Sequence, residues 1–141
     1  MFSKKTFITR SARQTVELGK KIARLMKPDY KIYLYGELGS GKTTLIKGIC
    51  RGLNVKEEIT SPSFVVATEY RGRLPIAHID LYRLGPAELE TLPVEEYFVK
   101  GGITIIEWAD RLPAIKNKGL RIFIKMKGKN IREIIIENSG N

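Results

Sequence analysis

The chain has 141 residues, a length typical of one domain, so we expect residues 1–141 to fold as a single unit. Its hydrophobic content of 43% is ordinary for a globular protein. No apolar run reaches the ~18 residues that a membrane-spanning helix needs, and no secretory signal is expected at the basic N-terminus. A single cysteine, Cys50, excludes an internal disulfide and fits a reducing cytoplasm, where we expect the protein.

The net charge of +10 is large for this length. The densest basic run consists of Lys116, Lys118, Arg121, Lys125, Lys127, Lys129 and Arg132. Such a surface suits an acidic partner, either RNA or protein, or serves only to keep the protein soluble. Few aromatic residues interrupt the run, which disfavours direct stacking on single-stranded nucleic acid.

Helices alternate with strands in the first half of the chain. Ser11 is a candidate N-cap for a helix that runs to about Lys27. A short β-prone run, KIYLY, occupies residues 31–35. A second helix is expected from Thr43 to a stop at about Gly52.

The second half is richer in strands. Strands are expected at residues 64–70, 74–80, 103–106, 120–126 and 131–137, and short helices that open with proline at residues 86–91 and 93–98. The run at 103–106, ITII, is apolar throughout, as in a strand buried on both faces. We therefore predict an α/β fold in which helices flank a mixed central sheet and a β-hairpin closes the chain.

The loop from Gly36 to Thr43, GELGSGKT, fits the phosphate-binding pattern G-x-x-x-x-G-K-[ST] at every fixed position. Its glycines let successive N–H groups point into one concavity, and the following helix adds its N-terminal dipole. Lys42 is expected to contact the β- and γ-phosphates, and the Thr43 hydroxyl to bind Mg²⁺. The strand before the loop and the helix after it are the context that this pattern requires. We therefore predict a P-loop NTPase-like domain.

Two acidic residues are candidates for the groups that hold Mg²⁺ and position the attacking water. Glu107 follows the apolar run 103–106, and ligands of open α/β sheets bind at the carboxyl ends of strands. Asp80 lies in the segment HIDLYR, where extended backbone would place His78, Asp80 and Tyr82 on one face. Simpler interpretations remain open, with Glu107 as a surface acid and His78 as a structural histidine.

Three further features each allow two interpretations. Trp108 either packs against a nucleotide or only buries apolar area. Arg83 either pairs with a neighbouring acid or approaches a phosphate. The segment TSPSF at 60–64 either carries hydroxyls toward a γ-phosphate, as in nucleotide switches, or is an ordinary turn before a strand.

Taken in order, GELGSGKTT, TSPSF, HIDLYRL at 78–84 and IEW at 106–108 resemble the TsaE (YjeE) family of ATPases, which serves the synthesis of threonylcarbamoyladenosine in tRNA. The resemblance implies a small enzyme that binds ATP and Mg²⁺ and hydrolyses ATP. Hydrolysis would be slow in the protein alone and would depend on partner proteins. The implied partners are TsaB and TsaD, of which TsaD transfers the threonylcarbamoyl group to adenosine 37. Contact with tRNA would be direct or through these partners.

Carried to this sequence, the resemblance implies roles for individual residues. The nucleotide would be held by Leu38, Gly39, Ser40, Gly41, Lys42, Thr43, Thr44, Trp108 and Arg132, with Arg132 beside the adenine. Magnesium would be bound by Thr43, Asp80 and Glu107, and the catalytic residues would be Lys42, Asp80 and Glu107.

Two other functions are compatible with a phosphate-binding loop. A small-molecule kinase needs an acceptor pocket and a closing lid, and the chain shows no insertion long enough for a lid. An interaction module would bind ATP with little hydrolysis and use the basic surface to contact an acidic partner. Measurement of ATP turnover separates these functions.

Overall fold

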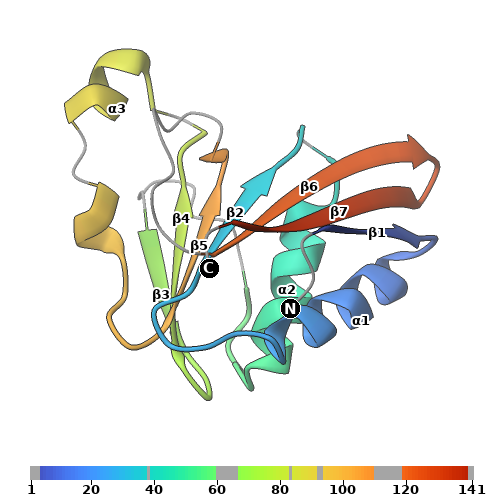
Figure 1. Cartoon of the computed structure of the whole chain (residues 1–141), viewed down its shortest axis with the longest axis horizontal. Coiled ribbons are helices and arrows are strands. Elements are labelled where there is room, and N and C mark those ends of the chain that lie inside the picture. Colours follow the sequence, from blue (N-terminus) through green and yellow to red (C-terminus); the bar gives the residue numbers. More distant parts are fainter. Residues whose placement is uncertain are drawn as a thin grey trace.

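The computed structural model describes residues 4–37, 39–59, 67–82, 84–91, 94–109 and 119–139. Within these ranges one seven-stranded mixed sheet has the order β1-β7-β6-β2-β5-β4-β3 (Figure 1). The strands are β1 Lys4–Thr9, β2 Lys31–Tyr35, β3 Ala67–Arg71, β4 Pro75–Asp80, β5 Ile103–Glu107, β6 Gly119–Gly128 and β7 Ile131–Ser139. The helices are α1 Ala12–Ala23, α2 Lys42–Gly52, α3 Pro86–Thr91 and the 3₁₀-helix η1 Val94–Tyr97. The predicted α/β fold with a mixed sheet is confirmed.

Four neighbouring strands form a parallel centre. β2 pairs in parallel with both β5 and β6, and β4 pairs in parallel with β5. The carboxyl ends of these strands therefore lie at one edge of the sheet. Every residue of β5 is buried, as its continuous apolar sequence predicts for a strand covered on both faces.

Helices cover the two faces of the sheet unequally. Figure 1 shows α1 and α2 side by side on one face, where Ile22 and Ile49 join Ile32 and Ile105 in the larger core cluster. On the other face a smaller cluster gathers around Tyr33, Ile79, Leu81, Ile106 and Ala109, with residues of α3 and η1 packed against it. The alternation of side chains along β2 and β5 thus supplies both clusters.

Glycines bring α1 and α2 into backbone contact. A Cβ atom added at Gly19 would lie 2.6 Å from the carbonyl oxygen of Leu45 and 2.7 Å from the amide nitrogen of Ile49. A Cβ atom at Gly48 would collide with the carbonyl oxygen of Val16. Any side chain at these two positions would force the helices apart, so the glycines set how closely α2 lies to α1.

Two predictions for the N-terminal half were incomplete. Ser11 caps α1 as predicted and accepts a hydrogen bond from the amide of Gln14, but the helix ends at Ala23, before the predicted end at Lys27. There the amide of Met26 bonds the carbonyl of Ala23, three residues back, so a tighter turn replaces the helix. Strand β1 was not predicted at all, because it forms only through antiparallel pairing with β7 at the far end of the chain.

The strands predicted in the second half are confirmed, with altered bounds. β3 begins at Ala67, and residues 64–66 of the predicted strand lie outside the described residues. The predicted helix at 93–98 is a 3₁₀-helix over Val94–Tyr97, while α3 has the predicted bounds. The C-terminal hairpin is longer than predicted and turns at Asn130, whose φ of 63° suits asparagine.

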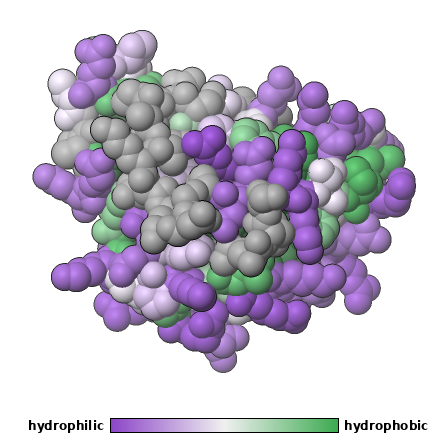
Figure 2. Space-filling model, viewed as in Figure 1, coloured by the Kyte–Doolittle hydropathy of each residue, from purple (hydrophilic) through white to green (hydrophobic). Residues whose placement is uncertain are grey.

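Polar side chains dominate the face of the molecule in Figure 2. Among the described residues, no helix is long and apolar enough to cross a membrane.

Candidate functional site

Three predicted site elements meet at the carboxyl edge of the parallel strands. The glycine-rich loop begins directly after β2, Asp80 is the last residue of β4, and Glu107 is the last residue of β5. The register pairs Leu34 of β2 with Glu107, and Glu107 with Asp80. Residues far apart in the sequence therefore become neighbours, because their strands end at the same level. Ligand sites of open α/β sheets lie at such carboxyl ends.

The described part of the loop has the backbone shape that its glycines permit. Gly39 and Gly41 have φ angles of 76° and 105°, in the left-handed region that other residues rarely adopt. A Cβ atom at Gly39 would meet nothing within 4 Å, so this glycine faces open space. Helix α2 starts at Lys42 after Gly41, which offers no side chain to cap the first amides of the helix. These amides are suited to binding an anion.

Lys42 lies beneath this loop and is only 5% exposed. Its Nζ atom donates to the carbonyl oxygens of Gly36 and Glu37, the latter at 2.9 Å. The same atom lies 4.1 Å from the ring centroid of Trp108, within the range of a cation–π contact. The loop backbone and Trp108 therefore hold the ammonium group inside the site. Thr43 and Thr44 follow in the first turn of α2 and are half-buried.

Glu107 is buried and paired with a histidine. Its side chain is 4% exposed, and its Oε2 atom lies 2.6 Å from Nε2 of the fully buried His78. His78 precedes Asp80 by two residues on β4, so both side chains lie on the face of the sheet that α2 covers. The predicted interpretation of Glu107 as a surface acid is wrong, because the strand end is enclosed.

Asp80 is half-buried beside the same groups. Burial raises the pKa of its carboxyl above the ordinary value, and the charge of Glu107 raises it further. A hydrogen bond from the amide of Tyr82 to Oδ1, at 2.9 Å, and the charge of Lys42 oppose this rise. Asp80 and Glu107 thus form a pair of acids in the field of one buried lysine.

Tyr82 does not project beside His78 and Asp80 as predicted. β4 ends at Asp80, so the strand alternation stops before Tyr82 is reached. Tyr82 is instead exposed and its ring packs on Trp108, with centroids 4.8 Å apart. Trp108 has a φ of 61°, uncommon for a bulky residue, at the point where the chain turns after β5.

Arg132 approaches the loop from the C-terminal hairpin. A Cβ atom at Gly41 would lie 3.2 Å from its Nε atom. The structure therefore brings Arg132 next to the loop, while its predicted position beside the adenine stays a prediction. The other basic residues of the hairpin are interspersed with Glu133 and Glu137, and Glu133 pairs with Lys127 at 3.8 Å.

Several predicted residues lie outside the described residues. They are Leu38 of the loop, the segment 60–64, Arg83 and the part of the basic run at 116–118.

Three described side chains near the loop carry oxygen atoms of the kind that magnesium binds. No group of three or more His, Cys, Asp or Glu side chains suited to a metal occurs within the described ranges. Mg²⁺ is usually bound by one or two carboxylates together with phosphate oxygens and water, rather than by a full protein cage. Asp80, Glu107 and the hydroxyl of Thr43 match that smaller set in chemistry.

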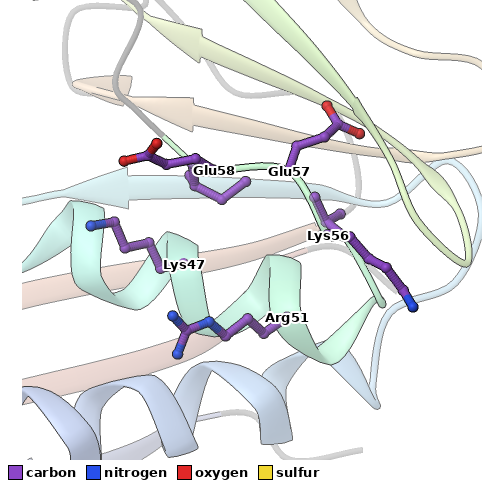
Figure 3. Close-up of a pocket in the computed structure, with 7 residues that line it drawn as sticks. Lys47, Arg51, Lys56, Glu57 and Glu58 are labelled. Carbon is purple, nitrogen blue, oxygen red and sulfur yellow. The ribbon is translucent and has the colours of Figure 1, made fainter.

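A separate hollow of about 380 Å³ lies along the outer side of α2. Figure 3 shows Lys47 and Arg51 extending from α2 and the acids Glu57 and Glu58 on the segment that follows the helix. Both signs of charge line this hollow, so it does not offer the uniform field that a polyanion prefers. Nearby Cys50 is buried, and burial together with Glu57 raises the pKa of its thiol to about 12, which makes this cysteine a poor nucleophile.

The pairing of His78 with Glu107 was not predicted. The two residues are 29 positions apart and meet only because β4 and β5 are adjacent and in register. The one available signal was the alternation of His78 and Asp80 on a strand that was expected to lie near the loop.

Comparisons with known proteins identify the family of this chain. The family model for "Threonylcarbamoyl adenosine biosynthesis protein TsaE" matches residues 9–134. The chain is 38% identical over 130 residues to the tRNA threonylcarbamoyladenosine biosynthesis protein TsaE of Bacillus subtilis, which covers 91% of this chain and 82% of that protein. It is 34% identical over 131 residues to the protein of the same name from Treponema pallidum, covering 92% of this chain and 97% of that protein.

A solved structure is similar over the whole fold. The crystal structure of Bacillus subtilis YdiB superposes with a TM-score of 0.77 at 35% sequence identity, covering 100% of this chain and 89% of that chain. The chain therefore belongs to the TsaE family of tRNA threonylcarbamoyladenosine biosynthesis proteins.

Proposed function

We propose that this chain binds ATP with Mg²⁺ and hydrolyses it in support of the protein assembly that forms threonylcarbamoyladenosine at position 37 of tRNA. The observation that carries the proposal is the meeting of Lys42, Asp80 and Glu107 at the carboxyl ends of β2, β4 and β5. A buried cation beside a glycine-rich loop suits phosphate, and two acids beside that cation suit a metal and a water.

The roles of the residues follow from their chemistry. Lys42 and the first amides of α2 bind the β- and γ-phosphates, while Thr43 and Asp80 bind Mg²⁺. Glu107, buried and paired with His78, orients the attacking water or binds the metal through water. Bound Mg²⁺ supplies charge neutralisation on the phosphate oxygens.

The nucleotide base has two candidate neighbours. Arg132 lies against Gly41 of the loop, and Trp108 with Tyr82 forms an aromatic pair above Lys42. An arginine and aromatic rings both stack on a planar base without selecting its edge. ATP is proposed as the nucleotide because the sequence resembles a family of ATPases.

We also propose that the chain acts in the cytoplasm with TsaB and TsaD, and that it contacts tRNA through them or through the basic hairpin. The test measures ATP turnover by the purified protein alone, and then with TsaB, TsaD and substrate tRNA. Turnover that rises in the full mixture supports the proposal. Negligible turnover in every mixture, with ATP binding intact, refutes hydrolysis and leaves an ATP-dependent interaction module, whereas phosphate transfer to a metabolite supports a kinase.

Matched variants sharpen the same test. Lys42→Ala should weaken ATP binding, since it removes the cation beneath the loop. Glu107→Ala should leave binding nearly unchanged and mainly lower turnover. Equal turnover in Glu107→Ala and the wild type would show that Glu107 has no catalytic role.

A further inference from the structure

His78 is a buried histidine that the proposed chemistry does not yet use. Its side chain is fully buried, and it is the only histidine in the chain. Buried polar groups cost free energy unless they are hydrogen-bonded, so a buried imidazole needs a partner. Its one described partner is Glu107, at 2.6 Å from Nε2.

The other ring nitrogen identifies which atom carries the proton. Nδ1 of His78 is buried and has no hydrogen-bond partner among the residues that the structure describes. A hydrogen on Nδ1 would therefore be a buried donor without an acceptor, which native proteins strongly avoid. With the hydrogen on Nε2, that nitrogen donates to Glu107 Oε2 and leaves only a lone pair at Nδ1. In this arrangement Oε2 of Glu107 accepts the hydrogen bond.

This hydrogen bond fixes the direction of the Glu107 carboxylate. β4 and β5 are parallel neighbours, and the partner of Glu107 in the register is Asp80, two residues beyond His78. The hydrogen bond from His78 therefore runs obliquely between the two strands, toward the carboxyl end of β5, and holds Oε2 next to β4. Oε1 is the atom left for a water or a metal-bound water at the loop.

We infer that His78 is a positioning residue, whose Nε2–H orients the Glu107 carboxylate for ATP hydrolysis without touching the nucleotide. The inference rests on the proposed function, because it assigns Glu107 to the hydrolytic step. Hydrogen-bond partners that orient a catalytic or metal-binding group typically contribute roughly 10–100-fold. A misplaced group affects the rate far more than nucleotide binding, which depends on the loop and Lys42.

The first experiment locates the proton by ¹⁵N NMR of the imidazole in the tag-free protein. Because the chain holds one histidine, both ring-nitrogen signals belong to His78, and their different couplings to the ring hydrogens distinguish Nδ1 from Nε2. We expect a hydrogen on Nε2 and none on Nδ1, and a shift of the Nε2 signal in Glu107→Gln. A hydrogen on Nδ1, or a spectrum unchanged by Glu107→Gln, would overturn the inference. This readout requires neither ATP nor magnesium.

The second experiment is a double-mutant cycle on ATP turnover in the complete assembly. His78→Met keeps the length of the side chain and removes the donor, whereas His78→Gln keeps an N–H at the position of Nε2. We expect His78→Met to lower kcat about 10–100-fold with ATP affinity within about 3-fold of wild type, and His78→Gln to recover most of the rate. In a Glu107→Gln background, His78→Met should change kcat by less than about 2-fold, because His78 acts through Glu107.

The outcomes separate the inference from the proposed function. Absence of turnover in the wild type refutes hydrolysis, and the NMR result still decides whether His78 holds Glu107. If His78→Met keeps the wild-type turnover, the positioning role is refuted and the proposed function is not. The same holds if His78→Met lowers kcat equally in the wild-type and Glu107→Gln backgrounds. If His78→Met does not fold, the turnover of His78→Gln is compared with that of wild type. Because His78→Gln keeps the N–H donor, a complete loss of turnover in this variant would contradict the positioning role.

Discussion

The contact between α1 and α2 predicts that a single methyl group at Gly19 destabilises the protein. In Gly19→Ala the new Cβ atom would lie within 2.8 Å of three backbone atoms of α2, including the carbonyl oxygen of Leu45 at 2.6 Å. Backbone atoms cannot rotate away as a side chain can. The helices must therefore separate by roughly 0.5–1 Å to restore normal carbon contacts, and a gap of that size forfeits about a quarter to a half of the dispersion energy between them.

Two opposing effects set the size of the change. Overpacking of a close contact costs about 1–3 kcal/mol and occasionally more, so we take about 2–4 kcal/mol for a clash with backbone. Alanine is a better helix former than glycine by about 1 kcal/mol. The net loss in the free energy of unfolding is then about 1–3 kcal/mol, which lowers Tm by about 3–10 °C in a domain of this size.

Differential scanning calorimetry on matched variants checks this value. Gly85→Ala is the control, because an added Cβ there meets only the Glu88 Oε1 atom, at 3.4 Å, and its Tm should stay within about 2 °C of wild type. A Tm for Gly19→Ala equal to or above that of wild type would refute the conclusion that glycine sets the helix separation. Because α2 carries Lys42 and Thr43, Gly19→Ala should also weaken ATP binding below its melting temperature.

Three further predictions concern the site and the core. Trp108 is the only tryptophan and lies 4.1 Å from Lys42 Nζ, so ATP with Mg²⁺ should change its fluorescence saturably. Lys42→Met should weaken that binding about 10–100-fold while Lys47→Met, on the exposed side of α2, leaves it unchanged. The raised pKa of Asp80 means that its neutral form favours folding at low pH and that this contribution is lost as pH rises. In urea denaturation, the stability of Asp80→Asn relative to wild type should therefore rise as the pH increases from 3.8 through the pKa of folded Asp80 and then stay constant, while turnover falls; a relative stability that does not rise would contradict this. The thiol of Cys50, with its pKa raised from 9.0 to about 12, contributes stability that is complete below pH 9 and lost toward pH 12. Cys50 should react with Ellman's reagent at pH 8 only in urea, and rapid labelling of the native protein would exclude a buried thiol.

Local sequence predicted the elements whose stability is local or whose apolar pattern is continuous. The run KIYLY predicted β2 with the bounds that the structure has, and ITII predicted a strand buried on both faces. Ser11 marked the start of α1, because a cap depends on residues within one turn. The end of α1 at Ala23 escaped prediction, since the helical pattern of the side chains continues to Met26, which is buried in the core beyond the helix.

Strand β1 shows what sequence alone cannot supply. Its residues KKTFIT include no alternation strong enough to predict a strand, and the strand is mostly exposed. It exists because each residue from Lys4 to Thr9 pairs with β7, more than 120 positions away. A pairing of such long range depends on the position of the whole C-terminal hairpin, which no local pattern records.

The site was predictable as a set of residues but not as a set of contacts. The loop pattern and two acids at strand ends identified Lys42, Asp80 and Glu107, because parallel strands bring such ends together. That Glu107 is enclosed and bonded to His78 required the register of β4 against β5. The packing of Tyr82 on Trp108 likewise depended on where β4 ends, a boundary that side-chain alternation cannot fix.

The burial of these ionisable residues costs free energy that folding does not require, and the proposed function would account for it. Lys42, His78 and Glu107 are each no more than 5% exposed, although a charged group loses hydration free energy on burial. Replacement of a buried polar pair by apolar residues of similar size is often neutral or stabilising, so stability alone does not require His78 and Glu107 at these positions. The pair is held in place because each member satisfies the other, and the low dielectric around it strengthens the field that the loop experiences. A strand end that keeps a lysine, a histidine and a glutamate buried next to a half-buried aspartate is organised for charge, which is what the proposed phosphoryl chemistry would require.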